Sequence, residues 1–327
     1  MSSKRTKQIS LSETFESVRS AGVAEVGTIR ARGIFGPFYV GVDEAGCGVF
    51  MISMTGSDAA EPSIRTQNLE ADFGLDCQLE IGGKPHTLVL SKVHCLDTDP
   101  RTTAHFMSLC ESIMGLIGSE PSARAVHDSV LRIASLFLSF NETPRSTWAG
   151  LIGELTFLLS LVDADSGVRA WRMDDADRVD FVFDAYRVEI KCTTKRERKH
   201  LVTYEQANNF SSKSTYIGSI FLERLDHGFS VSDAVSMLEN RCTEPELRFK
   251  LREIVATTLG SNLRFMSEEC FDVEFSLGSI QLYDAAEIPA IRGEVPAGVS
   301  RVTFESDFSG AMPAAGGPFN FRSELGS

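Results

Sequence analysis

The stretch Arg178–Thr193, with the sequence RVDFVFDAYRVEIKCT, predicts two short strands joined by a tight turn. Successive side chains of a strand point to opposite faces, so Glu189 and Lys191 share one face of the second strand. Packing alone gives a buried sheet no reason to place two charges side by side. A hairpin would also bring Asp180, near the start of the first strand, beside Glu189.

The segment before this hairpin predicts a helix with one charged residue. Between Arg145 and Asp163 that residue is Glu154, and its neighbours are mostly apolar. A helix that is apolar on most of its faces is expected to be buried. A buried carboxylate costs free energy unless it is paired, hydrogen-bonded or bound to a metal. Glu154 is therefore either a structural ion-pair partner or a member of a functional site.

These residue types together predict hydrolysis of a phosphodiester bond. Asp180 and Glu189 are hard carboxylates that suit Mg²⁺, with Mn²⁺ as an alternative ion, and the metal activates bound water. Lys191 can orient that water and offset charge at the phosphorus. Glu154 is expected to add a further metal contact, through water. The competing interpretation is a structural hairpin without catalytic activity.

A basic stretch, Lys195–His200, follows the second strand. It also contains Glu197-Arg198-Lys199, which repeats the Glu-x-Lys spacing between charged rather than apolar neighbours. Charge runs are usually solvated loops, but one beside a metal site favours contacts to DNA phosphates. Such contacts are expected from Lys195, Arg196, Arg198, Lys199 and His200, and base contacts from Asn208 and Asn209.

The first third of the chain favours short strands. A helix is expected to begin at Ser10, where Ser10 and Glu13 fit a capping box. Strands are expected over 38–42 and 49–54, and a hairpin over 78–90 that turns at two glycines. These segments predict a β-rich N-terminal domain over residues 1–97, for recognition of DNA or binding of a partner.

Helical periodicity begins near Asp99, and residues 98–308 are predicted to form the nuclease domain. Pro121 is expected at an early position of one helix. The tail, 309–327, is rich in glycine, alanine and proline and is expected to be flexible. Expected helices cover 100–117, 121–139, 145–163, 230–240 and 244–258, and expected strands cover 179–184, 187–193, 214–223, 271–282 and 299–306.

Composition restricts the class of protein. The 327 residues include seven scattered cysteines without a Cys-x-x-Cys pair, which favours free thiols in a reducing compartment. We find neither an apolar run long enough to span a membrane nor a signal peptide, so the chain is expected to be cytoplasmic. The net charge of −13 does not favour a nucleic-acid partner, although phosphate binding depends on the local surface.

Several of these segments resemble a known family. They are Gly150–Leu158, Val179–Phe181, Val188–Thr194 and Tyr204–Gln206. Together they are similar to the PD-(D/E)XK motif proteins of bacterial genomes, which occur in restriction and phage-defence loci. One departure is Val179, which stands where the motif has a proline before Asp180.

The resemblance implies an α/β, restriction-endonuclease-like core with a mixed sheet flanked by helices. It implies an active site of Glu154, Asp180, Glu189, Lys191 and Gln206. The expected activity is Mg²⁺-dependent cleavage of double-stranded DNA by a homodimer, in a restriction or anti-phage system with methyltransferase or ATPase partners. The alternative is a non-catalytic DNA-binding or scaffolding subunit that retains the nuclease-like fold.

Overall fold

A computed structural model describes residues 11–54, 61–139, 143–144, 147–172, 179–208, 213–314 and 319–322. The chain divides into two compact units, Met1–Thr143 and Pro144–Ser327, and each is described by itself. Within the described residues, every helix is too short or too polar to cross a membrane.

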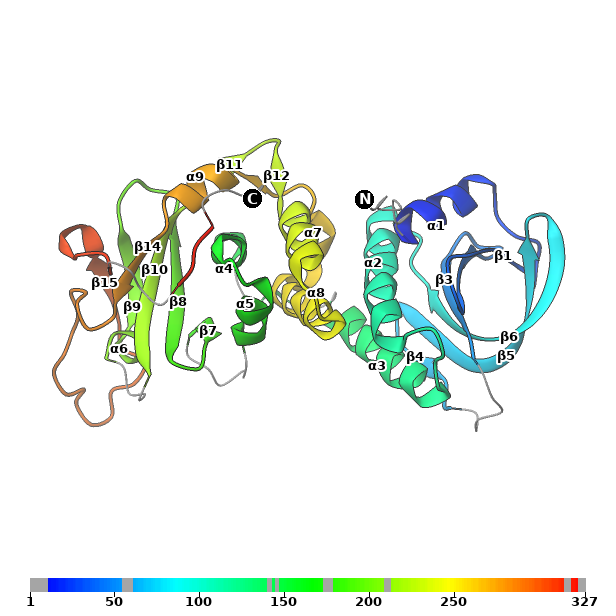
Figure 1. The fold of residues 1–327 in the computed structure, drawn as a ribbon, viewed down its shortest axis with the longest axis horizontal. Helices are drawn as coiled ribbons and strands as arrows, with labels where there is room; N and C mark the ends of the chain where they lie inside the picture. The colour runs from blue at the N-terminus through cyan, green and yellow to red at the C-terminus, as the bar shows by residue number, and fades with distance from the viewer. Residues whose placement is uncertain are drawn as a thin grey trace, which may run out of the picture. The chain divides into compact units, whose positions relative to one another are not determined.

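The first unit is built around a six-stranded sheet in the order β1-β2-β3-β6-β5-β4. β1 also pairs in parallel with β5, so five strands close into a ring, which Figure 1 shows at the blue and cyan end of the chain. The hairpin predicted at Gly82 and Gly83 is present, and both glycines have positive φ. The strands are β1 (Ile29–Gly33), β2 (Phe38–Val42), β3 (Gly48–Ser53), β4 (Ile64–Arg65), β5 (Leu69–Ile81) and β6 (Lys84–Cys95).

Three helices belong to this unit: α1 (Leu11–Ser20), α2 (Pro100–Ile117) and α3 (Ala123–Ser139). α2 packs on α1 and β3, and α3 packs on β5, so the unit extends to Thr143. A boundary at residue 97 was predicted instead, because helical periodicity shows that a face is buried but not which sheet buries it. Pro121 precedes α3, and the Ser122 hydroxyl accepts from the Ala125 N–H. Ser10 lies outside the described residues.

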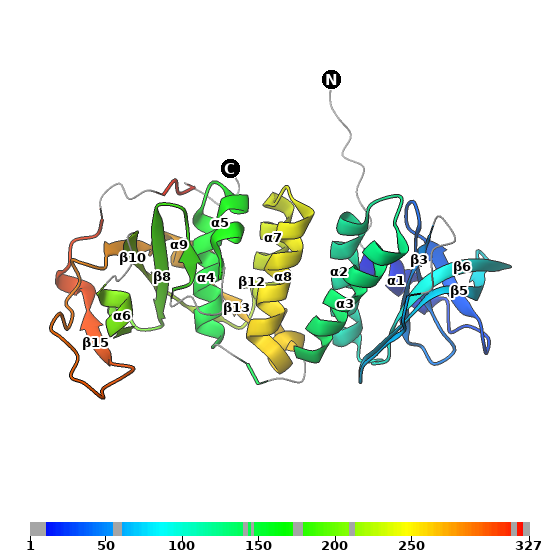
Figure 2. The ribbon, with the colours of Figure 1, turned by 90° about the horizontal axis from the view of Figure 1, so that it is seen from below.

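The second unit contains a four-stranded mixed sheet in the order β14-β10-β8-β7. β8 and β10 are parallel, whereas β7 and β14 run antiparallel to their neighbours. Helix α4 (Trp148–Ser160) packs on β8, and Figures 1 and 2 both show it alongside that strand. The mixed α/β class was predicted. The strands are β7 (Phe181–Val182), β8 (Tyr186–Thr193), β10 (Ser214–Phe221) and β14 (Gln281–Asp284).

Other elements surround this sheet. The strand expected over 271–282 is wrong, because Asp272 accepts from the Phe275 N–H and begins a helix there. The basic stretch was not expected to continue into a strand, but Lys199–Thr203 pairs with Thr303–Asp307. The remaining elements are α5 (Ala164–Ala170), β9 (Lys199–Thr203), α6 (Tyr204–Ala207), β11 (Arg224–Leu225), β12 (Phe229–Ser230), α7 (Val231–Arg241), α8 (Pro245–Leu259), η1 (Gly260–Phe265), β13 (Cys270–Phe271), α9 (Val273–Gly278), β15 (Thr303–Asp307) and η2 (Phe308–Gly310).

The described parts of the C-terminal segment are hydrogen-bonded to the rest of the second unit. The Ala314 N–H donates to the Leu282 carbonyl, and the Arg322 N–H donates to the Ser160 carbonyl at the end of α4. The ring of Phe319 meets that of Tyr186 edge-on, with centroids 4.6 Å apart. These described parts of the segment therefore pack on the sheet and on α4, where a flexible tail was expected.

Candidate active site

The hairpin formed by β7 and β8 brings Asp180, Glu189 and Lys191 together. Asp180 directly precedes β7, and its Oδ2 accepts from the Ile190 N–H at 2.7 Å. The Nζ of Lys191 lies 2.6 Å from Oε1 of Glu189 on the same face of β8. Glu189 is only 7% exposed. A carboxylate just before β7, a second on β8 and one lysine therefore lie close together on the hairpin at one edge of the sheet.

Helix α4 supplies Glu154 from its buried middle turn. The Trp171 Nε1–H donates to Glu154 Oε2, and the Arg172 Nη2 to Glu154 Oε1, each at 2.6 Å. Trp171 and Arg172 were not predicted from the sequence. The available signal was that a lone carboxylate in an apolar helix needs partners. The sequence did not show where in the chain those partners lie.

Gly153 allows α4 to approach β8 closely. A Cβ at this position would lie 1.9 Å from the Cys192 Sγ and 3.2 Å from the Ile190 Cγ2. Glycine is therefore needed here, because it lets the backbone of α4 contact the side chains of β8. This contact places the next residue, Glu154, against the strand that carries Glu189.

The three carboxyl groups repel one another in a buried setting. Burial, followed by the charge of Asp180, raises the pKa of Glu154 to about 7, although Arg172 and Trp171 oppose the shift. Burial and Asp180 likewise raise the pKa of Glu189 to about 8, against the effect of Lys191. The pKa of Asp180 is also raised by burial. Such clustered shifts are typical of functional sites and favour a bound cation.

We expect the burial of these acids, together with their mutual repulsion, to make stability fall with rising pH when chelator is present. The pKa values of Glu154 and Glu189 exceed their ordinary value of 4.5, so the folded chain binds more protons than the unfolded chain between about pH 4.5 and 8. The free energy of unfolding therefore decreases across that window. Thermal unfolding in EDTA at several pH values measures this decrease.

The matched variant for that measurement is Glu189→Gln, which carries no titrating group at this position. Its loss of stability between pH 5 and 8 should be smaller than that of the wild type. The difference between the two proteins separates the site from the general effect of a negative net charge. Parallel pH profiles would contradict the assignment of the raised pKa to Glu189.

The donor set fits a metal held by two carboxylates. Mg²⁺ commonly takes one or two protein carboxylates and keeps several waters, and Asp180 and Glu189 supply such a pair on adjacent strands. Within the described residues, however, no group of three or more His, Cys, Asp and Glu side chains is placed to hold an ion. The Glu154 carboxylate instead accepts hydrogen bonds from Trp171 and Arg172.

The basic stretch divides into buried and exposed residues. Arg198 donates to the Ser219 carbonyl and hydroxyl and to the Ser279 carbonyl, and its guanidinium lies over the ring of Phe221. His200 is 4% exposed, bonds the same Ser219 hydroxyl, and has its pKa lowered by burial to about 4. The prediction that Arg198 and His200 contact phosphate is therefore wrong, because both side chains are structural.

The other basic side chains of the stretch face solvent. Arg196 pairs with Glu223 and Lys199 pairs with Glu197, while Lys195 is also exposed. Of the asparagines proposed to touch bases, Asn208 donates to the Tyr204 and Ile291 carbonyls. Asn209 lies outside the described residues. Phosphate contacts can therefore come only from the exposed members of this stretch.

Gln206 is the third residue of helix α6, and its side-chain oxygen caps the start of that helix. Its Oε1 accepts from the Thr203 N–H at 3.0 Å, and the Thr203 hydroxyl accepts from the Gln206 N–H. This capping box orients the short helix after β9. The observed role of that oxygen is structural, and a catalytic role for Gln206 stays a prediction.

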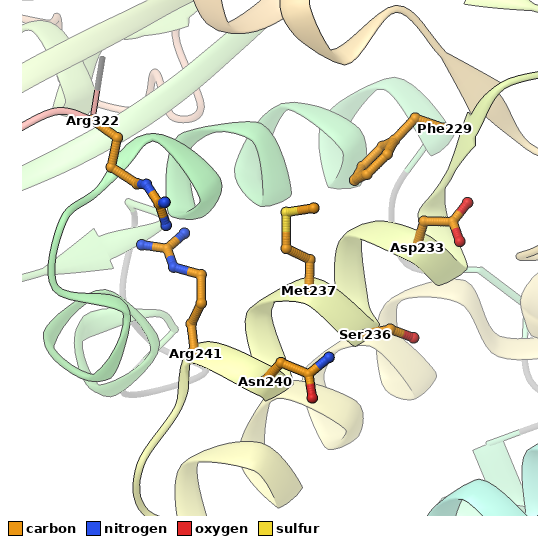
Figure 3. Close-up of a pocket in the computed structure, with 7 residues that line it drawn as sticks. All are labelled: Phe229, Asp233, Ser236, Met237, Asn240, Arg241 and Arg322. Atoms are coloured by element: carbon orange, nitrogen blue, oxygen red, sulfur yellow. The ribbon is translucent and has the colours of Figure 1, made fainter. Parts of the chain in front are cut away.

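A pocket of about 490 Å³ lies beside α7 and is lined by none of the three carboxylates. Figure 3 shows the guanidinium groups of Arg241 and Arg322 facing one another, with Met237 and Phe229 farther along the wall. Arg241 donates to the carbonyls of Leu159 and Leu161. It thus caps the C-terminal end of α4 and stabilises the helix that carries Glu154.

A mixed α/β unit with an Asp…Glu-x-Lys hairpin defines a nuclease-like protein of the PD-(D/E)XK class. The chain belongs to the family described as "Putative PD-(D/E)XK family member (DUF4420)", whose model matches residues 28–309. The resemblance noted from the sequence is thereby confirmed, and the match includes strands of both units. No curated protein and no solved structure matches the chain.

Proposed function

We propose that the protein is a Mg²⁺-dependent endonuclease that hydrolyses phosphodiester bonds of double-stranded DNA. The observation that carries the proposal is the grouping of Asp180, Glu189 and Lys191 on one hairpin, with Lys191 Nζ 2.6 Å from Glu189. Membership of a nuclease-like family supports the same reaction type.

Asp180 and Glu189 are the residues that would hold the divalent ion. When bound, the ion polarises a phosphoryl oxygen and lowers the pKa of its water. Lys191 lies beside Glu189, so it can orient the attacking water and offset the negative charge that develops on the phosphate. Burial of Glu154 and Glu189 excludes bulk water, which strengthens each of these electrostatic interactions.

DNA would be held first through its backbone. The exposed side chains of Lys195, Arg196 and Lys199 lie between the end of β8 and the start of β9 and are suited to sequence-independent phosphate contacts. The β-rich first unit, with its closed ring of strands, is proposed to recognise DNA or a partner protein. A homodimer would allow both strands to be cut. A role in restriction or anti-phage defence, with methyltransferase or ATPase partners, rests on the resemblance alone.

Cleavage assays test this proposal. Purified protein is incubated with unmethylated and with modified plasmid DNA, in Mg²⁺ or Mn²⁺ and in EDTA. We expect nicked or linear product only with the ion, and none from Asp180→Asn under the same conditions. Equal cleavage by the wild type and by Asp180→Asn would contradict the assigned site. So would a complete lack of cleavage with every ion, DNA and partner.

A second function is favoured by a different observation. Arg172 and Lys191 already neutralise two of the acids, and the described residues form no three-ligand metal group. The protein would then be a non-catalytic DNA-binding or scaffolding subunit. Calorimetric titration with Mn²⁺ separates the two functions. A scaffold gives no binding heat that depends on Asp180, and Asp180→Asn leaves its DNA affinity unchanged.

A further inference from the structure

Arg172 is a cation that contacts the cluster of three carboxylates formed by Glu154, Asp180 and Glu189. It lies outside the strands that the sequence predicts. Its Nη2 lies 2.6 Å from Glu154 Oε1, and its Nη1 donates to the Thr258 hydroxyl of α8 at 2.5 Å. Its backbone N–H donates to the Asp180 carbonyl at 2.9 Å. The side chain is 30% exposed. Arg172 therefore links α4, α8 and the residue that begins the catalytic hairpin.

The backbone of Arg172 is in the left-handed region, with φ of 42°. This conformation is unfavourable for a non-glycine residue, and it persists where the surroundings impose it, often at functional sites. In an extended chain, neighbouring side chains point to opposite sides. The turn at Arg172 allows Trp171 and Arg172 to donate to the same carboxylate of Glu154. The strained residue thus directs two consecutive donors at one acid.

The formal charges of Arg172 and of the acidic and basic side chains around it nearly cancel. With all three acids ionised, Glu154, Asp180 and Glu189 contribute three negative charges, and Lys191 and Arg172 contribute two positive ones, which leaves a net charge of −1. Without the charge of Arg172 the cluster would carry −2, which equals in magnitude the charge of a divalent cation. Arg172 therefore neutralises Glu154, a charge that a nearby cation would also neutralise.

We propose that Arg172 is the internal counter-ion of Glu154 and competes with a divalent cation for that carboxylate. This inference rests on the proposed metal-dependent function and deepens it. Arg172 is a positioning residue: when no ion is bound it keeps a buried acid paired, and it weakens the affinity of the site for metal. The protein is thus stabilised before metal binding at the cost of a less tightly held ion.

Calorimetric titration of the full-length protein with Mn²⁺ tests the competition. Arg172→Gln removes the charge and should bind Mn²⁺ about tenfold more tightly than the wild type, the order expected for one charge a few ångströms away. Arg172→Lys keeps the charge and should stay within about twofold of the wild type. Arg224→Gln removes an exposed, ion-paired guanidinium of the same unit and should leave the affinity unchanged.

A double-variant cycle covers the case in which Arg172→Gln does not fold. Glu154→Gln leaves the charge of Arg172 uncompensated, so it should bind Mn²⁺ several-fold more weakly than the wild type. Glu154→Gln combined with Arg172→Gln removes both charges and should restore the affinity to within about twofold. If Arg172 had a purely structural role, the two single variants would not shift the metal affinity in opposite directions, and the double variant would not restore it.

The possible failures are distinguishable. If the wild type binds Mn²⁺ through Asp180 but Arg172→Gln binds equally or more weakly, the counter-ion inference is overturned and the proposed nuclease stands. The counter-ion inference is likewise overturned if the double variant, which lacks both charges, binds Mn²⁺ as weakly as Glu154→Gln. If the wild type gives no binding heat that Asp180→Asn abolishes, the metal-dependent function fails, and this inference fails with it.

Discussion

Replacing Lys191 with alanine should lower the rate of DNA cleavage by on the order of a thousandfold, the loss seen when one preorganised donor to a transition-state charge is removed. Lys191 lies on the face of β8 that carries Glu189, and its Nζ lies 2.6 Å from that carboxylate. Without it, the attacking water loses its orienting group and Glu189 loses its partner. Initial rates of plasmid cleavage in Mg²⁺ measure the effect.

The chain contains a matched control for this variant. Lys199 has the same spacing from Glu197 and lies 2.9 Å from it, but this pair is exposed. At saturating DNA, Lys199→Ala should therefore keep the cleavage rate within a few-fold, since it removes a weak surface ion pair and one of several proposed phosphate contacts but nothing at the carboxylates. Circular dichroism establishes that both variants fold. An equal loss of activity in the two variants, or full activity in Lys191→Ala, would refute the assigned role of Lys191.

The second large effect is expected from Gly153→Ala. In an ordinary helix this change stabilises by roughly 0.5–1 kcal/mol, because glycine has high conformational entropy when unfolded. Here the added Cβ would lie 1.9 Å from the Cys192 Sγ. Overpacking of this kind costs about 1–3 kcal/mol, so the net effect should be destabilising. The shift of α4 should also displace Glu154 and reduce cleavage at least tenfold.

Urea unfolding measures the loss of stability, and a second substitution tests its cause. The Gly153→Ala, Cys192→Ala double variant removes the sulfur, and the nearest remaining atom of that residue, its Cβ, lies 3.6 Å away. Most of the stability should therefore return. Gly278→Ala in α9 meets no atom within 4 Å and should not destabilise. If Gly153→Ala had the stability and the cleavage rate of the wild type, the close approach of α4 to β8 would be unimportant.

The hairpin could be predicted because its information is local. The alternation from Val188 to Cys192 indicates which side chains share a face, and a short turn indicates which residues pair. Phe181 accordingly pairs with Val188 in the structure. Glu154 could be singled out for a similar reason, since one carboxylate in an apolar helix is conspicuous without any knowledge of tertiary contacts.

The remaining features depend on residues far apart in the sequence. Arg198 is buried because it meets Ser219 and Ser279, which lie 21 and 81 residues away. A run of basic residues does not reveal such partners, so phosphate contacts were predicted for Arg198 together with its neighbours. Arg172 reaches Glu154 only through a left-handed turn. Left-handed backbone is readily predicted at glycine but not at arginine.

The parallel pairing of β1 with β5 has a consequence for how the first unit folds during synthesis. Ala31 of β1 pairs with Ile81 of β5, which is made 50 residues later. At roughly 5–20 residues per second, one edge of β1 waits several seconds on the ribosome for its neighbour. An unpaired strand edge can join another chain during that interval. The closing strand therefore makes the nascent chain most vulnerable to misassembly before residue 81 emerges, and a chaperone would act most usefully in that interval.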